Sequence, residues 1–179
     1  MQDALCYVAS AVESVADIPI PQRRSEGGAV RVAGVSHVPI QVSDIESSLR
    51  FYRDFLGMTV SLDLHEVHEA YGIDRRGVYL RWHDVPRSPF IVLAQPLDRA
   101  ATGSASRLFD VGIDHIGFFV DDVAAYIRRA EEMGIERFGR PGPVGVQPPS
   151  AHGDEGGGHV ETVMFFDPDR VVVQLDQWV

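Results

Sequence analysis

The segment HVPIQVSDIESSLRFYRDFLGM (residues 37–58) is followed further along the chain by a related segment, HIGFFVDDVAAYIRRAEEMGI (residues 115–135). The two segments match at four positions: His37 with His115, Val42 with Val120, Asp44 with Asp122, and Arg50 with Arg128. A repeat of this length indicates a duplicated supersecondary unit. The matched histidines suggest that both units contribute to one site on their common axis.

The surroundings of the first segment predict the order strand, helix and three strands. An alternating apolar pattern predicts the first strand over 34–42. Ser43 and Glu46 form an S-x-x-E capping box, which predicts a helix from there to about Leu56, with Gly57 as its C-terminal stop. The three later strands are expected at 58–65, 77–84 and 89–95.

The surroundings of the second segment predict the same order. The expected elements are a strand over 113–120, a helix over 121–134, a short strand over 135–139, and a closing hairpin over 159–166 and 170–178. Asp167, Pro168, Asp169 and Arg170 supply the turn of that hairpin. Residues 141–158 are rich in glycine and proline, and a loop of this length is either a functional lid or a surface insert.

These patterns divide the chain into four expected parts: an N-terminal helix and linker over 1–31, a first module over 32–98, a connector over 99–111 and a second module over 112–179. The apolar residues of the N-terminal segment have helical spacing. They are Leu5, Val8, Val12 and Val15. A helix with this apolar stripe would pack on the body or on a second subunit, so we expect a homodimer.

The composition of the 179-residue chain excludes several function classes. A net charge of −10 leaves no basic surface for nucleic acid or for an anionic membrane. All 16 basic residues are arginine, so Schiff-base chemistry on lysine is excluded. Cys6 is the only cysteine, which is consistent with a reducing compartment. No apolar run reaches the roughly 20 residues of a membrane span, and we expect a cytoplasmic protein.

Residues 33–179 resemble the vicinal oxygen chelate superfamily, the group of glyoxalases, bleomycin-resistance proteins and extradiol dioxygenases. The motifs that carry the resemblance are FYRDFLG at 51–57 and FFDPDRVVVQLDQ at 165–177. The ending VVVQLDQW (residues 171–178) and the start of the second module, GIDHIGFFVDDV (residues 112–123), look most similar to methylmalonyl-CoA epimerases and glyoxalase I-like enzymes. The resemblance implies an α+β fold in which two tandem βαβββ modules form a cup-shaped mixed sheet, here with an added N-terminal helix.

The resemblance also implies one divalent metal ion (iron, manganese, cobalt, nickel or zinc), held by residues of the first and last strands of each module. His37 and His115 match the two first-strand ligand positions. Gln174 falls where the family usually has glutamate. The fourth position is Val92, which cannot bind a metal, unless a bulge shifts the register and brings Gln95 there.

The residues themselves agree with part of this expectation. Side chains alternate along a strand, so His37 and His115 point away from the helix layer. Glutamine cannot accept a proton at neutral pH, and Asp176 or Glu161 would have to supply a catalytic carboxylate. If Asp176 reached the metal, two histidines and one carboxylate would form a triad suited to iron and oxygen.

Other side chains would complete the pocket. Tyr79 and Arg81 share one face of a strand, where an arginine would suit an anionic substrate such as a carboxylate or a coenzyme A thioester. Phe119 shares the face of His115. His152 and His159 bracket the glycine-rich loop, where they either close over a ligand or remain solvated.

Three functions follow from these features. The first is a metal-dependent isomerase, epimerase or lyase that acts on a small oxygenated molecule. The second is an iron-dependent extradiol-type dioxygenase, which needs a carboxylate ligand. The third is a metal-free binding protein of the bleomycin-resistance kind, favoured by Val92 and Gln174 and opposed by the two histidines.

Overall fold

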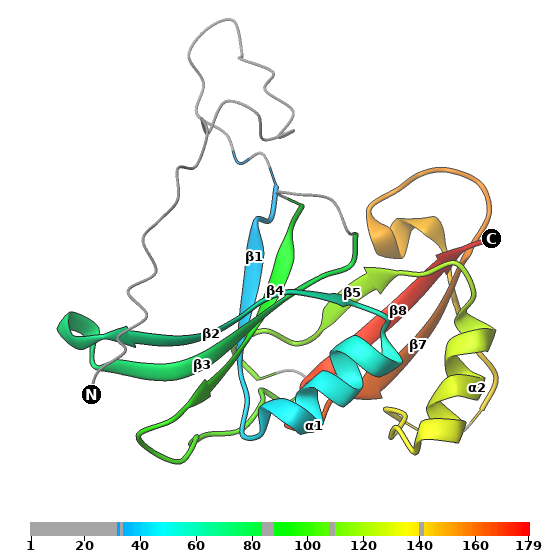
Figure 1. The fold of residues 1–179 in the computed structure, drawn as a ribbon. Helices are drawn as coiled ribbons and strands as arrows, with labels where there is room; N and C mark the ends of the chain where they lie inside the picture. The colour runs from blue at the N-terminus through cyan, green and yellow to red at the C-terminus, as the bar shows by residue number, and fades with distance from the viewer. Residues whose placement is uncertain (1–31, 33, 84–87, 108–109, 140–141) are drawn as a thin grey trace, which may run out of the picture.

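The computed structural model describes residue 32 and residues 34–83, 88–107, 110–139 and 142–179 (Figure 1). The predicted N-terminal helix lies outside these residues. No helix in the described part of the chain is long and apolar enough to cross a membrane.

The first module forms a four-stranded mixed sheet, which we call sheet A. Its strands have the order β1-β4-β3-β2, in which β1 runs parallel to β4 and the other neighbours are antiparallel. Its elements are β1 (His37–Gln41), α1 (Ile45–Leu49), the π-helix η2 (Arg50–Phe55), β2 (Thr59–His68), the 3-10 turn η3 (Glu69–Tyr71), β3 (Ile73–Arg81) and β4 (Phe90–Pro96).

The second module repeats this order as sheet B, with strand order β5-β8-β7-β6 and β5 parallel to β8. Its elements are β5 (Ile116–Phe119), α2 (Val123–Met133), β6 (Gly145–Gln147), the 3-10 helix η4 (Pro149–His152), β7 (Val160–Phe166) and β8 (Val172–Trp178). Two four-stranded mixed sheets with few helices confirm the predicted α+β class and the duplicated βαβββ order.

One predicted strand is misplaced. Residues 135–139 form no strand and contribute only an isolated bridge between Arg137 and Phe165. The second strand of the module is instead β6, which lies inside the segment that was expected to be a loop and pairs with β7. A strand of three residues that begins with glycine and is followed by proline is too short to show strand alternation, which explains why the sequence pattern missed it.

The predicted capping box is also wrong. Asp44 caps α1, because its carboxylate accepts a hydrogen bond of 2.7 Å from the backbone N–H of Ser47. Asp122 caps α2 in the same way, with a hydrogen bond of 2.8 Å from Ala125. Ser43 instead donates its backbone N–H to Asp169. The aspartate shared by the two repeats therefore fixes the start of each helix.

A glutamine at the end of each last strand supports the same helix start. The side-chain oxygen of Gln95 accepts from the backbone N–H of Ile45 at 2.9 Å, and that of Gln177 accepts from Val123 at 2.9 Å. Both glutamines thus face the helices. The alternative in which a bulge turns Gln95 to the other face is excluded, since no register shift interrupts β4.

Replacing Gln177 with alanine is expected to lower the free energy of unfolding by about 1 kcal/mol, because a helix N–H loses its acceptor. Gln95→Ala should have an effect of similar size in the first module. Urea titrations followed by circular dichroism would measure both, with exposed Gln41→Ala as the matched control. Midpoints equal to that of the control would contradict the assigned role.

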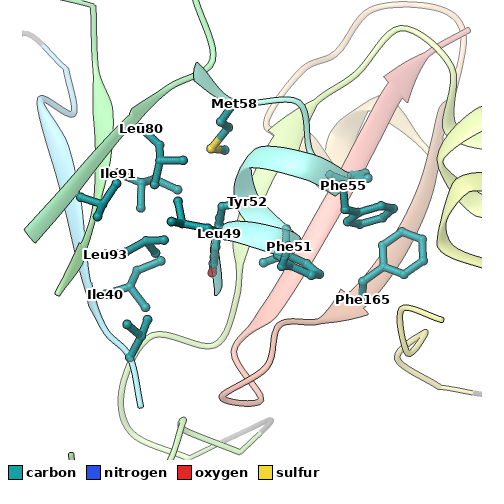
Figure 2. Packing of buried hydrophobic residues seen from close by; sticks show 14 of the residues in the cluster. Ile40, Leu49, Phe51, Tyr52, Phe55, Met58, Leu80, Ile91, Leu93 and Phe165 are labelled. Atoms are coloured by element: carbon teal, nitrogen blue, oxygen red, sulfur yellow. The ribbon is translucent and has the colours of Figure 1, made fainter. Parts of the chain in front are cut away.

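The core lies where α1 and η2 pack between the two sheets (Figure 2). Figure 2 shows Leu49 and Tyr52 directed towards sheet A, while Phe55 meets Phe165 of β7, with ring centroids 5.1 Å apart. The Tyr52 hydroxyl also donates to Asp167 at 3.0 Å, in the turn before β8. One helix therefore joins both modules, and each sheet turns its other face, here called its outer face, away from this core.

Candidate functional site

Three predicted site residues contact Phe90 on the outer face of sheet A. The His37 ring stacks on Phe90 with centroids 5.2 Å apart and an interplanar angle of 11°. The Tyr79 ring lies 5.6 Å from Phe90, and the Arg81 guanidinium lies 4.9 Å from its centroid. The sequence analysis did not single out Phe90, although its position next to His37 in the parallel pairing of β1 and β4 explains this role.

Tyr79 also belongs to a polar group at the β2 side of this face. Its hydroxyl donates to Glu66, which receives a second hydrogen bond of 2.6 Å from Arg75. Burial alone would raise the pKa of Glu66, but these hydrogen bonds outweigh burial and the pKa is lowered. Burial and the neighbouring Glu66 carboxylate raise the pKa of Tyr79. Tyr79 therefore remains a neutral hydroxyl at physiological pH.

Gln174 and Asp176 meet on the outer face of sheet B. The Gln174 amide nitrogen lies 2.9 Å and 3.1 Å from the two carboxylate oxygens of Asp176, and both side chains are buried. A carboxylate can only accept here, so the amide nitrogen faces Asp176 and the amide oxygen faces away. Gly117 of β5 borders this pair, since a Cβ atom there would lie 3.6 Å from an Asp176 oxygen, an ordinary contact distance.

His152 of η4 lies over Asp176. Its Nδ1 atom is 4.0 Å from an Asp176 oxygen, and both side chains are largely buried. The His152 ring is also 6.4 Å from Phe119 and 5.8 Å from Trp178, measured between centroids. Residues 148–157, which contain η4 and are here called the cover, thus lie over part of the outer face of sheet B. The predicted pocket residue Phe119 lies at the edge of this cover.

Glu161 does not join this group. It pairs in register with Gln177, whose side chain caps α2, so Glu161 lies on the helix side of β7. Gln174 and Asp176 lie on the opposite face. Of the two predicted carboxylates, only Asp176 therefore shares a face with the predicted ligand Gln174.

Each of the repeated histidines interacts with the residue before it. The His37 Nδ1 atom is 2.9 Å from the Ser36 hydroxyl, and the His115 Nδ1 atom is 2.9 Å from the Asp114 carboxylate. A polar partner on one ring nitrogen orients an imidazole and directs the other nitrogen towards a ligand. Ser36 and Asp114 were not recognised in the sequence, because an isolated serine or aspartate beside a histidine is uninformative.

Val92 occupies the position of the first module that corresponds to Gln174 in the second. It pairs with Pro39 of β1, just as Gln174 pairs with Gly117 of β5, so the two residues occupy equivalent positions. Val92 is only 4% exposed and offers no donor atom. Among the described residues, no group of three or more histidine, cysteine, aspartate or glutamate side chains is placed to hold a metal.

The donor types still fit a transition-metal ion. Two imidazoles and one amide oxygen, from His37, His115 and Gln174, are ligands that such ions accept. The contact from Gln174 to Asp176 resembles the hydrogen bonds that orient metal ligands in proteins. The set has one donor fewer than the four positions that the resemblance implies.

A cavity of about 460 Å³ lies where the first strands of the two modules approach each other. Its wall includes Pro39 and Gln41 of β1, Asp114 and Ile116 at the start of the second module, and connector residues 101–106. Pockets of roughly 300–1,000 Å³ are typical of small-molecule sites. Val38 and Asp114, the sequence neighbours of the two repeated histidines, therefore line one space of suitable size, whereas the predicted site residues themselves are not part of its wall.

Comparison with known families identifies the class of protein. The sequence model of the Glyoxalase/Bleomycin resistance protein/Dioxygenase superfamily matches residues 34–175. The chain therefore belongs to this superfamily, as its motifs predicted. A comparison with curated protein sequences found no match.

Solved structures share the fold at low sequence identity. A glyoxalase family protein from Bacillus cereus superposes with a TM-score of 0.66 at 12% identity, covering 85% of this chain and 98% of the other. A trypanothione-dependent glyoxalase I from Leishmania major gives 0.54 at 22% identity, covering 79% and 84%. The fosfomycin resistance protein FosX from Mesorhizobium loti gives 0.51 at 18%, covering 81% and 91%.

Proposed function

We propose that this protein is a metal-dependent enzyme that isomerises, epimerises or cleaves a small oxygenated molecule, such as a 2-oxoacid derivative or an acyl-CoA. His37, His115 and Gln174 would hold one divalent metal ion. The observation that carries the proposal is the repeated arrangement of the histidines, each with its Nδ1 atom held by the preceding side chain. Superfamily membership and the cavity beside both histidines support it.

A bound divalent ion would supply Lewis-acid stabilisation of negative charge on a substrate oxygen. The residues of the chain would provide the remaining functions. Asp176 is the proposed proton acceptor, held in place by the Gln174 amide. On sheet A, Arg81 would bind an anionic group of the substrate. The Tyr79 hydroxyl, whose hydrogen is donated to Glu66, would accept a hydrogen bond from the substrate. Phe119 would contact apolar parts of the substrate.

We also propose a homodimer. The predicted site residues lie on the outer faces of two different sheets, and a second copy of the chain could bring such faces together. Members of this superfamily often act as dimers. Sedimentation velocity of the full chain should give twice the 19.7 kDa mass of one chain, and a species of single-chain mass would exclude the dimer.

Purified, untagged protein is expected to contain about one equivalent of a transition metal per chain, because the two histidines and the glutamine would hold one ion. Plasma mass spectrometry would measure it. The His37→Ala, His115→Ala double variant should lose the metal. His65→Ala is a suitable control, because His65 pairs with Asp74 at the far end of the β2–β3 hairpin.

A metal-free ligand-binding protein is the second candidate. The observation that favours it is Val92, an apolar residue in the position that repeats Gln174. Protein that takes up no metal from iron, manganese, cobalt, nickel or zinc solutions would exclude the enzyme proposed above and support this alternative. Metal uptake equal in wild type and double variant would exclude the proposed ligands.

A further inference from the structure

We propose that His152, Thr162 and Asp176 form a subsite for the hydroxyl group of an aromatic ligand, on the outer face of sheet B beneath residues 148–157. This inference rests on the proposed small-molecule site and specifies its ligand class. It does not require a metal, since none of the three residues is among the proposed ligands.

Two buried polar atoms in this place have no hydrogen-bond partner within the described residues: His152 Nε2 and Thr162 Oγ1. Thr162 is 8% exposed. Buried polar atoms of folded proteins are nearly always hydrogen-bonded, and leaving one unpaired costs about 1–3 kcal/mol. The two atoms are therefore suited to a polar group that comes from outside the chain.

The side chains of His152 and Thr162 both lie next to the Asp176 carboxylate. Thr162 of β7 pairs directly with Asp176 of β8, so their side chains are neighbours on one face. The His152 ring approaches Asp176 from the cover, with Nδ1 at 4.0 Å from an oxygen. Gly145 of β6 leaves space for the threonine side chain, because a Cβ atom at that position would lie only 2.9 Å from Thr162 Cγ2.

The orientation of His152 determines which group fits. The Nδ1 atom lies 4.0 Å from an Asp176 oxygen, which is longer than a hydrogen bond. We propose the tautomer that carries its proton on this side of the ring, which leaves Nε2 as an acceptor. Thr162 Oγ1 can donate or accept. A hydroxyl group matches both atoms, since its hydrogen donates to Nε2 and its oxygen accepts from Thr162. An ether oxygen can satisfy only the threonine.

Aromatic side chains mark the edge of the subsite. Phe119 is 67% exposed and Trp178 is 43% exposed, and both rings contact His152. Their centroids are 6.3 Å apart with planes at 27°. Exposed rings of this kind favour a planar ligand that can stack on them. A phenolic compound combines such a ring with the required hydroxyl.

The way in which the cover is connected to sheet B would let a ligand reach the subsite beneath it. The hydrogen bonds described within residues 148–157 are internal, from Ala151 to Pro148, Gly153 to Ser150, Asp154 to Pro149 and Gly156 to the Asp154 side chain. On either side, β6 and β7 hold the segment. The cover can therefore lift without losing any of these hydrogen bonds, which would expose His152 Nε2 to a ligand.

Phenol and anisole test this inference, because they share the ring and differ in the hydroxyl hydrogen. Ligand-detected NMR titrations on the full-length protein should show at least about tenfold tighter binding of phenol, the effect of one well-placed hydrogen bond. His152→Ala and Thr162→Val should each reduce this preference to about twofold or less. His159→Ala and Thr59→Val serve as matched controls and should retain it.

Equal affinity for phenol and anisole in the wild type, or no detectable binding of phenol, would overturn the inference. So would an undiminished preference in both His152→Ala and Thr162→Val, with folding checked by thermal melts. Metal content measured on the same samples separates this result from the proposed function. A phenol preference without metal keeps the subsite and excludes the metalloenzyme, whereas metal without the preference does the reverse.

Discussion

Replacing Phe55 with alanine is expected to destabilise the protein by about 3–5 kcal/mol, the usual cost of removing a fully buried aromatic ring. Phe55 is 0% exposed and contacts Phe51 of its own helix. It also contacts Tyr126 of α2 and Phe165 of β7, with centroids 5.7 Å and 5.1 Å away. The cavity would therefore open between the modules, at the contact that holds them together.

Urea unfolding would measure this loss, and the tryptophans allow it to be assigned. Trp82 follows β3, and its ring lies 5.8 Å from that of Phe118 in β5, so its fluorescence reports on the contact between the two sheets. Trp178 lies in β8 and reports on sheet B, and variants that keep only one tryptophan separate the two signals. Both signals should shift to lower urea in Phe55→Ala, whereas exposed Phe119→Ala should change stability by less than about 1 kcal/mol. A shift in only one signal would show that the modules unfold independently and that Phe55 does not couple them.

Replacing Tyr52 with phenylalanine is expected to cost about 1–3 kcal/mol at neutral pH, because the buried Asp167 carboxylate loses a hydrogen-bond donor. The same variant should change the stability at alkaline pH. Burial, together with the Asp167 charge, raises the pKa of Tyr52 well above its ordinary value of 10.0. The folded protein therefore keeps the phenolic proton at a pH where the unfolded chain loses it.

The sign of the pH effect follows from this difference. Above pH 10 the unfolded state binds fewer protons, so wild-type stability should fall by up to about 1.4 kcal/mol per pH unit through Tyr52. Tyr52→Phe should lack this contribution, and the two stability curves should converge as the pH rises. Tyr71→Phe, at an 81% exposed position, is the control. Parallel curves for wild type and Tyr52→Phe would refute the assignment.

The sequence predicted the fold because its repeat contains most of the local signals twice. The strands at His37 and just after His115, a helix behind each of them and the closing hairpin all appear. The first helix differs from the prediction, because it is an α-helix over Ile45–Leu49 and a π-helix over Arg50–Phe55. Strand register then confirmed that Val92 repeats Gln174. Local patterns of this kind can be recognised in a single sequence, because side chains return to the same face about every 2 residues in a strand and about every 3.6 residues in a helix.

Other parts could not be predicted because they depend on contacts between distant segments. Ser43 and Asp44 both suit a helix cap, and only the contact of Ser43 with Asp169 decides between them. Strand β6 is too short to show a pattern. His152 is placed over Asp176 by the path of the cover, which no local signal encodes. The phenol subsite therefore has no counterpart in the sequence analysis.

The glutamines at the ends of β4 and β8 carry a consequence for the evolution of the chain. After duplication, both copies kept the same anchor for the helix, Gln95 and Gln177, on one side of the strand. On the other side they diverged, with Val92 and Ala94 in one copy and Gln174 and Asp176 in the other. Because neighbouring strand positions face opposite ways, new chemistry can be acquired on one side without loosening the scaffold on the other.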